Sequence, residues 1–204
     1  MSKVLVVCAH PDDEAVGCGG TLRRHALDGD EILAVFLTSG EAGGHGDADH
    51  GETRRREAQR AAAILGIATL EFWGQPDGRL RVSRSLAERL TALIDSSRPA
   101  LVYAPQPQDD HPDHRAAARL VRRAIASSRV TPGVRFFEIW SPLSDPDEII
   151  DISAVIADKR RAIRAYRSQC AVMRFDDAFE GLARYRGEMH SWPGGPYAEV
   201  FAGG

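Results

Sequence analysis

The residue types best suited to chemistry lie in one short segment near the N-terminus, His10-Pro11-Asp12-Asp13-Glu14. An imidazole and two carboxylates this close together can converge on one cation, since His and Asp are both ligands of zinc. Alternatively, Asp12 or Asp13 could simply cap the helix that follows, because Asp is a preferred N-cap residue. The segment predicts a metal site, with helix capping as the simpler alternative.

A second segment of similar composition, His111-Pro112-Asp113-His114, follows later in the chain. If the two segments lie side by side, His10, Asp13 and one of His111 or His114 would form a site of two histidines and one carboxylate with room for water. Three protein ligands and one open position are typical of catalytic zinc, whereas structural zinc sites are closed. The two segments together therefore predict a catalytic metal centre.

The residues that flank the two segments indicate how they could meet. Residues 3–8 and 101–104 are short apolar runs without alternation, the pattern of parallel strands that are covered by helices on both faces. Helical patterns follow the segments, over residues 15–27 and 116–126. Because open α/β sheets bind ligands beyond the carboxyl ends of their strands, both segments are expected at one edge of the same sheet.

The remaining chain continues to alternate between strands and helices. Further strands are predicted at residues 31–38, 69–73, 134–140, 148–152 and 197–201, and further helices at 53–65, 86–94, 156–166 and 170–190. This alternation predicts an α/β fold, a Rossmann-like three-layer α/β/α sandwich around a mostly parallel sheet. No repeat or linker interrupts the pattern, so residues 1–204 are predicted to form a single domain.

The composition of the chain limits the kinds of partner that it could bind and the cellular compartments in which it could function. A formal net charge of −3 provides no basic stripe, which argues against nucleic acid as a partner. No apolar stretch approaches the roughly 18 residues of a transmembrane segment, and the N-terminus lacks the pattern of a signal peptide. The three cysteines, Cys8, Cys18 and Cys170, fit no disulfide framework. We therefore expect a cytoplasmic protein, for which assembly into a homo-oligomer is left open.

A polar loop at residues 39–51 contains two further histidines, His45 and His50. Either could be a metal ligand, but the loop is rich in glycine and aspartate and has no apolar anchor. We predict that both side chains are solvated rather than ligands.

The segments Ala9-His10-Pro11-Asp12-Asp13-Glu14 and His111-Pro112-Asp113-His114 resemble the two signature motifs of the LmbE/PIG-L-like N-acetylglucosaminyl deacetylases. These enzymes are zinc amidases that remove acetate from N-acetylglucosamine conjugates. Shorter blocks in the same order extend the resemblance over nearly the whole chain, at residues 38–41, 54–58, 65–66, 76–78, 151–153, 159, 166–169 and 198–201.

The resemblance implies a cofactor and a reaction. It implies one zinc ion per chain, held by His10, Asp13 and His114, with Asp12 as the general base. The physical chemistry agrees, since amide hydrolysis at neutral pH needs an activated water and zinc lowers the pKa of its bound water toward about 7. The implied partner is a small-molecule N-acetylglucosamine conjugate.

The resemblance also implies roles beside the metal. His111, oriented by Asp113, would be the acid or the donor to the oxyanion, and Asp113 itself is a second candidate for the proton transfer to the departing amine. Arg54 would reach the substrate, and Asp77 would either line the sugar pocket or only form a turn. Some family members have a tyrosine just ahead of the second motif, where this chain has residues 108–110, Gln-Asp-Asp.

Other functions are weighed against this one. Another metal-dependent amidase could use the same residues, whereas a phosphoesterase would more often carry enough ligands for two metals. A dinucleotide-binding protein would need Gly-x-Gly-x-x-Gly after the first strand, which is absent from the sequence. A non-catalytic sugar-binding protein on the same fold would not need Asp12 and His111, and both are present.

Overall fold

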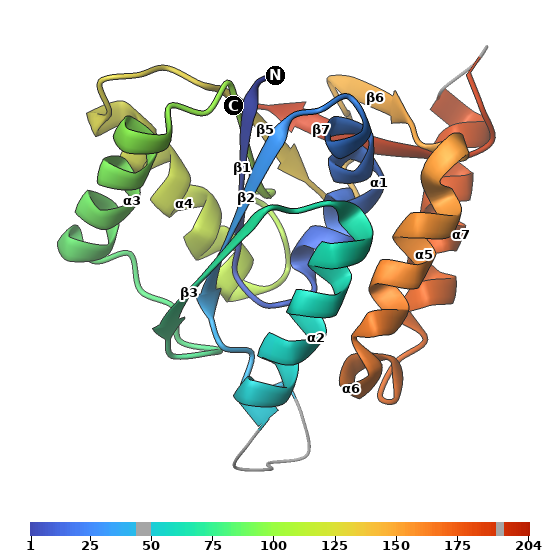
Figure 1. The fold of residues 1–204 in the computed structure, drawn as a ribbon, viewed down its shortest axis with the longest axis horizontal. Helices are drawn as coiled ribbons and strands as arrows, with labels where there is room; N and C mark the ends of the chain where they lie inside the picture. Colours follow the sequence, from blue (N-terminus) through green and yellow to red (C-terminus); the bar gives the residue numbers. More distant parts are fainter. Residues whose placement is uncertain (44–49, 191–193) are drawn as a thin grey trace.

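Figure 1 shows the computed structural model, which describes residues 1–43, 50–190 and 194–204. The strands are β1 (Lys3–Cys8), β2 (Glu31–Thr38), β3 (Thr69–Gln75), β4 (Leu101–Pro105), β5 (Gly133–Phe137), β6 (Glu148–Asp151) and β7 (Ala198–Gly203). The helices are α1 (Asp13–Leu27), α2 (His50–Leu65), α3 (Arg84–Ser97), α4 (Pro112–Ser127), α5 (Ile156–Ala165), α6 (Arg167–Cys170) and α7 (Phe175–His190), with a short 3-10 turn, η1 (Ser153–Val155).

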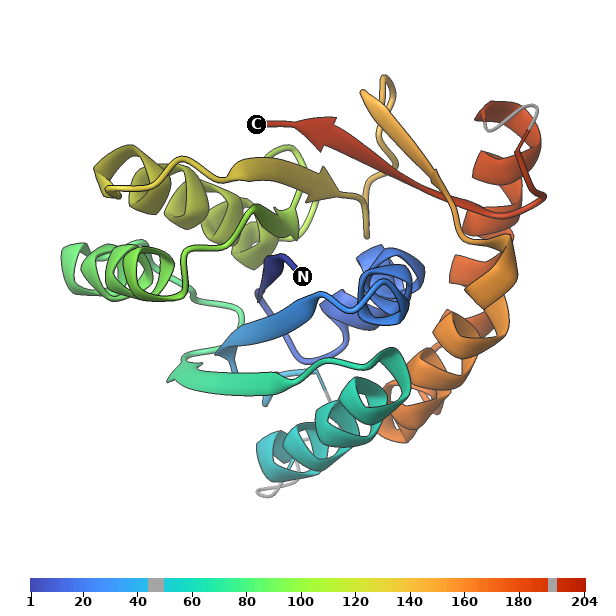
Figure 2. The ribbon, with the colours of Figure 1, turned by 45° about the horizontal axis from the view of Figure 1, so that its top comes forward.

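The strands form one sheet in the order β3-β2-β1-β4-β5-β7-β6. The first five strands along the chain pair in parallel, and β7 is inserted antiparallel between β5 and β6. Helices cover both faces of this sheet (Figure 2). The predicted α/β sandwich around a mostly parallel sheet is thus confirmed.

The two faces of β1 explain why its sequence is apolar without alternation. Val4, Val6 and Cys8 belong to the core beneath α1 and α2, while Leu5 and Val7 belong to the core beneath α3 and α4. Because successive side chains of a strand point to opposite faces, a strand between two helical layers buries all of them.

The same layering creates the crevice that holds the site. β1 and β4 are neighbours in the sheet, but α1 follows β1 on one face and α4 follows β4 on the other. The two connections therefore diverge at the carboxyl ends of β1 and β4, the place where open α/β sheets bind ligands. His10 and Asp12 lie in the first connection, and His111 ends the second.

Two predicted helices differ from the structure. The helix predicted at 170–190 begins only at Phe175, because a turn at residues 171–174 separates it from α6, which ends at Cys170. The helix predicted at 15–27 starts at Asp13 and breaks at Cys18, whose φ of −142° and ψ of 19° are not helical. Close packing explains the glycines around the break, since a Cβ on Gly17 would lie 2.2 Å from the ring of Phe137.

Buried charges bridge the break in α1. The carboxylate of Glu199 on β7 accepts hydrogen bonds from the backbone N–H groups of Gly20 (2.9 Å) and Thr21 (2.7 Å). The ammonium of Lys159 on α5 pairs with Glu199 at 2.5 Å and donates to the carbonyl of Val16 at 2.8 Å. The pair thus supplies partners to backbone groups on both sides of the break, as buried polar groups require.

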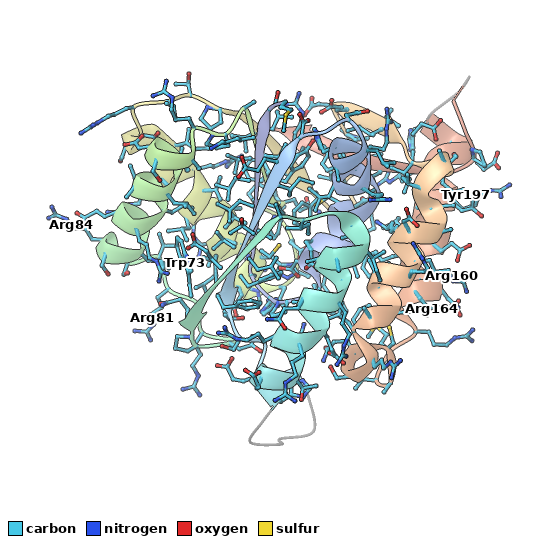
Figure 3. The ribbon with its side chains drawn as sticks, in the orientation of Figure 1. Trp73, Arg81, Arg84, Arg160, Arg164 and Tyr197 are labelled. Atoms are coloured by element: carbon cyan, nitrogen blue, oxygen red, sulfur yellow. The ribbon has the colours of Figure 1, made fainter. Side chains whose placement is uncertain are left out.

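The outer helical faces are charged. The side chains of Arg84 on α3 and Arg164 on α5 point away from the body of the molecule (Figure 3). In the described part of the chain, none of the helices has the length and apolar character that crossing a membrane requires.

Candidate active site

Three side-chain atoms from the two sequence motifs meet in the crevice. His114 Nε2 lies 3.2 Å from His10 Nδ1 and 3.2 Å from Asp13 Oδ1, and His10 Nδ1 lies 3.8 Å from Asp13 Oδ1. A tetrahedral zinc with bonds of about 2.0–2.1 Å would place its ligands roughly 3.3 Å apart. The three atoms therefore fit one zinc ion, and their residues are the predicted ligand set.

His10 is oriented by two carboxylates. Its second ring nitrogen, Nε2, lies 3.0 Å from Asp77 Oδ1 and 3.4 Å from Asp113 Oδ2. Backbone N–H groups of Gly78 and Leu80 hold the Asp113 carboxylate at 2.7 and 3.0 Å. A carboxylate behind a ligating histidine fixes its orientation and makes it more basic, so these contacts leave Nδ1 to bind a cation.

His114 has an orienting carboxylate that the sequence interpretation missed. Its Nδ1 lies 3.0 Å from Oδ1 of Asp109, which is fully buried. The other oxygen of Asp109 accepts the backbone N–H of Trp140 at 3.0 Å. The signal in the sequence was that Asp109 precedes the candidate ligand His114 by five residues, in the segment where some members of the resembling family have a tyrosine.

Asp12 lies beside this centre in an unusual backbone conformation. Its φ of 127° is in a region that residues with a side chain rarely adopt, and although it precedes α1 it makes no side-chain capping bond. The capping alternative therefore fails for Asp12. Such strain persists only where the surroundings impose it, and it is concentrated at functional sites.

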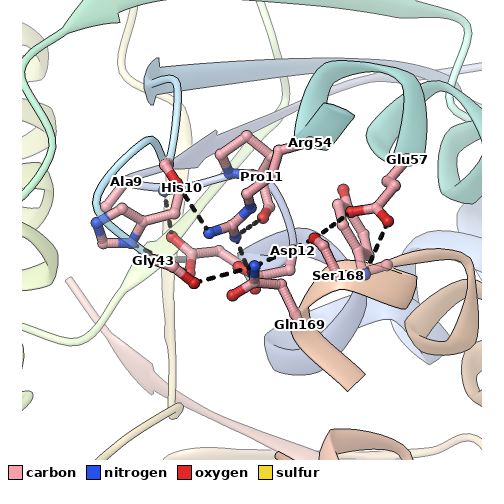
Figure 4. A network of polar contacts seen from close by, with 12 residues as sticks. Ala9, His10, Pro11, Asp12, Gly43, Arg54, Glu57, Ser168 and Gln169 are labelled. Atoms are coloured by element: carbon pink, nitrogen blue, oxygen red, sulfur yellow. Dashed lines mark hydrogen bonds and ion pairs between the residues drawn. The ribbon is translucent and has the colours of Figure 1, made fainter. Parts of the chain in front are cut away.

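Arg54 on α2 holds the Asp12 side chain (Figure 4). Its guanidinium pairs with the Asp12 carboxylate at 2.8 Å and donates to the backbone carbonyls of Pro11 and Gly40. Burial raises the pKa of Asp12 to about 6, against the opposing effect of Arg54. A carboxyl group with a pKa this near neutrality suits a general base.

His111 lines the same cavity from the start of α4. It is the N-cap of α4, where Pro112 occupies the first turn, and its Nδ1 accepts the backbone N–H of Asp113 at 3.2 Å. Burial, together with the neighbouring rings of His10 and His114, lowers the pKa of His111. The neutral ring then carries its proton on Nε2 and can donate it as a hydrogen bond.

A cavity of about 190 Å³ opens onto these groups. Its lining includes the polar side chains of Asp12, Arg54 and His111 and the aromatic rings of Trp140 and Phe175, which are 6.0 Å apart. A lining that combines a few polar groups with aromatic rings is typical of pockets for small molecules.

The predictions for Asp113 and His50 differ from the structure. The carboxylate of Asp113 contacts His10 rather than His111, and Asp113 does not line the cavity, so it is not placed to protonate a departing amine. Asp77 lines the cavity, which is one of its two predicted alternatives, and its carboxylate contacts His10 and the backbone N–H of Ala42. His50 is buried at the start of α2 rather than solvated, and His45 lies outside the described residues.

The chain is similar to one protein family, to two named deacetylases and to one solved hydratase structure. The PIG-L family, described as GlcNAc-PI de-N-acetylase, matches residues 5–125. The chain is 30% identical to diacetylchitobiose deacetylase of Thermococcus kodakarensis, over 83% of this chain and 70% of that protein. It is 32% identical to the probable N-acetyl-alpha-D-glucosaminyl L-malate deacetylase 2 of Bacillus cereus, over 83% of this chain and 84% of that protein. The solved structure of the 4-carboxy-2-hydroxymuconate hydratase GalB from Pseudomonas putida matches all of this chain and 96% of its own, with a TM-score of 0.87 and 26% identity.

Proposed function

The chain belongs to the PIG-L (GlcNAc-PI de-N-acetylase) family, and from this premise we propose that it is an N-acetylglucosaminyl deacetylase that releases acetate and a free amine. The observation that most supports the proposal is that the side chains of His10, Asp13 and His114 lie in contact at one cavity, with Asp12 beside them. The named deacetylases among its relatives support the reaction, and a single domain of residues 1–204 would carry it.

The proposed cofactor is one zinc ion, bound by His10 Nδ1, Asp13 Oδ1 and His114 Nε2. Zinc at this position would supply an acidified water and would polarise the acetyl carbonyl. The donor set supports zinc, because two imidazoles and one carboxylate are the ligands of open, catalytic zinc sites. The buried carboxylates of Asp77, Asp109 and Asp113 orient the two imidazoles, so these residues are proposed to tune the metal affinity.

Two residues are proposed to move or hold protons. Asp12 takes a proton from the attacking water, since its carboxylate faces the cavity and has a pKa near neutrality. His111 donates the Nε2 hydrogen to the oxyanion that develops on the acetyl group, which a neutral ring does without a change of protonation. With Asp113 turned away, Asp12 is also the group best placed to return a proton to the departing amine.

Arg54 is proposed to act chiefly through Asp12. It is the one cationic arginine or lysine side chain among the described residues that line the cavity, and it is buried against the Asp12 carboxylate. Within the part of the chain that the structure describes, its buried Nε has no hydrogen-bond partner.

The substrate is proposed to be a small N-acetylglucosamine conjugate. The three free cysteines, Cys8, Cys18 and Cys170, favour a reducing compartment such as the cytoplasm.

The test is acetate release from N-acetylglucosamine conjugates with different aglycones, namely a second N-acetylglucosamine, malate and inositol. Activity on at least one conjugate, with about one zinc per chain, is the expected result. The panel includes an enol acid such as the substrate of a hydratase, because a hydratase shares this fold. Hydration of that compound without acetate release from any conjugate would contradict the proposal.

A further inference from the structure

Glu14 and Tyr166 are buried polar side chains to which the proposed reaction gives no role. Glu14 is 0% exposed and Tyr166 is 1% exposed, and neither lines the cavity. The Tyr166 hydroxyl donates to Glu14 Oε1 at 2.5 Å. A buried carboxyl is costly, so its environment must satisfy both of its oxygens.

The second oxygen of Glu14 holds the backbone of Asp12. Glu14 Oε2 accepts the backbone N–H of Asp12 at 3.1 Å, at the residue whose φ is 127°. Side chains of successive residues normally diverge, yet Asp12 and Asp13 both reach the same cavity, where Asp13 lies 3.2 Å from His114. The strained conformation of Asp12 makes both orientations possible, and the bond from its N–H to Glu14 helps to maintain that conformation.

Tyr166 connects this arrangement to a distant part of the chain. It lies between α5 and α6, where its carbonyl accepts the N–H groups of Gln169 and Cys170 at 3.1 and 2.9 Å. These contacts fix the tyrosine from the C-terminal side, outside the residues 5–125 that the family matches. Its hydroxyl then reaches α1 across 152 residues of sequence.

We propose that Tyr166 is a positioning residue for the general base. Its hydroxyl fixes the Glu14 carboxylate, which in turn holds the strained backbone of Asp12 and so keeps the Asp12 side chain against the cavity. The proposal rests on the role given to Asp12 in the proposed function. The plainer alternative is that Tyr166 only fills the core with its ring, and removal of the hydroxyl alone separates the two.

The test compares Tyr166→Phe with Tyr103→Phe. Tyr103 is also 1% exposed, its hydroxyl contacts the half-buried His25 Nε2 at 3.0 Å, and like Tyr166 it does not line the cavity. Both variants lose one buried hydroxyl, so both should lose stability. Only Tyr166→Phe should lower kcat, on the order of 10- to 10²-fold as a misplaced catalytic group does, with KM and zinc content unchanged.

Crystal structures of both variants provide a readout that does not depend on activity. In Tyr166→Phe, the φ of Asp12 should leave the left-handed region, and its 2.8 Å contact with Arg54 should lengthen. In Tyr103→Phe, both should stay as in the wild type. An unchanged Asp12 in Tyr166→Phe, or equal kcat for the two variants, would overturn the proposal. If the wild type released no acetate, the proposed function would fail, while the conformation of Asp12 would still decide the positioning role.

Discussion

Replacing Asp12 by Asn separates the proposed base from the proposed metal ligand, Asp13, which is the next residue. Asn keeps the size of the side chain and a hydrogen-bond acceptor for Arg54, which lies 2.8 Å from the Asp12 carboxylate, but it cannot take a proton. A general base contributes about 10²- to 10⁴-fold, so the barrier should rise by roughly 3–5 kcal/mol. Because the three atoms proposed to bind zinc come from His10, Asp13 and His114, the zinc content should stay at the wild-type level.

Asp13→Asn is the matched comparison, because it makes the same chemical change one residue later. Asp13 Oδ1 lies 3.2 Å from His114 Nε2, so this variant should lose zinc affinity and recover part of its activity in excess zinc. Metal content by elemental analysis and acetate release should be measured on both folded proteins. Loss of zinc from Asp12→Asn with retention in Asp13→Asn would reverse the roles, and wild-type kcat in Asp12→Asn would refute the site.

Three further predictions follow from the contacts of the site. His114→Ala should be depleted of zinc after dialysis, and full retention would exclude His114 as a ligand. Asp109→Asn keeps only one of the two acceptor oxygens that the carboxylate uses, so zinc should bind roughly 10- to 100-fold more weakly in a zinc titration. The exposed neighbour gives the control, since Asp110→Asn should bind zinc as the wild type does. Arg54→Ala removes the ion-pair partner of the largely buried Asp12 carboxylate and should lower the free energy of unfolding by roughly 3–5 kcal/mol in urea. The exposed Arg55→Ala should change it by about 0.5 kcal/mol or less, and equal losses in the two variants would mean that the Arg54–Asp12 pair contributes no more than a surface arginine.

The fold could be predicted from the sequence because its signals are local. The uninterrupted apolar runs at residues 3–8 and 101–104 indicate buried parallel strands, and both are strands in the structure. The two motifs follow those runs directly, so their convergence required only that the strands be neighbours. The break at Cys18 was not predicted, because it depends on Phe137 and Glu199, which pack against α1 from far along the chain.

The proposed zinc ligands could also be recognised from short segments of the sequence, but the residues that contact the side chains of the site could not. The resemblance named His10, Asp13 and His114, and their assignment as ligands stays a prediction that metal analysis must test. The sequence could not show that Asp113 turns toward His10, since this depends on the N–H groups of a loop at residues 78–80. Nor could it show that Arg54 pairs with Asp12, because α2 and the first motif meet only in the folded chain.

The contact between Glu199 and the broken helix α1 bears on when the proposed metal site can form during protein synthesis. Glu199 contacts Gly20 across 179 residues, whereas every proposed zinc ligand lies within the first 114 residues. During synthesis, a nascent chain therefore has all of the proposed zinc ligands long before β7 can supply Glu199 to the helix that begins with Asp13. Contacts this distant in sequence form late, because the intervening chain must first be ordered. Stable capture of the ion is thus expected to follow translation of the last strand rather than to accompany that of the motifs.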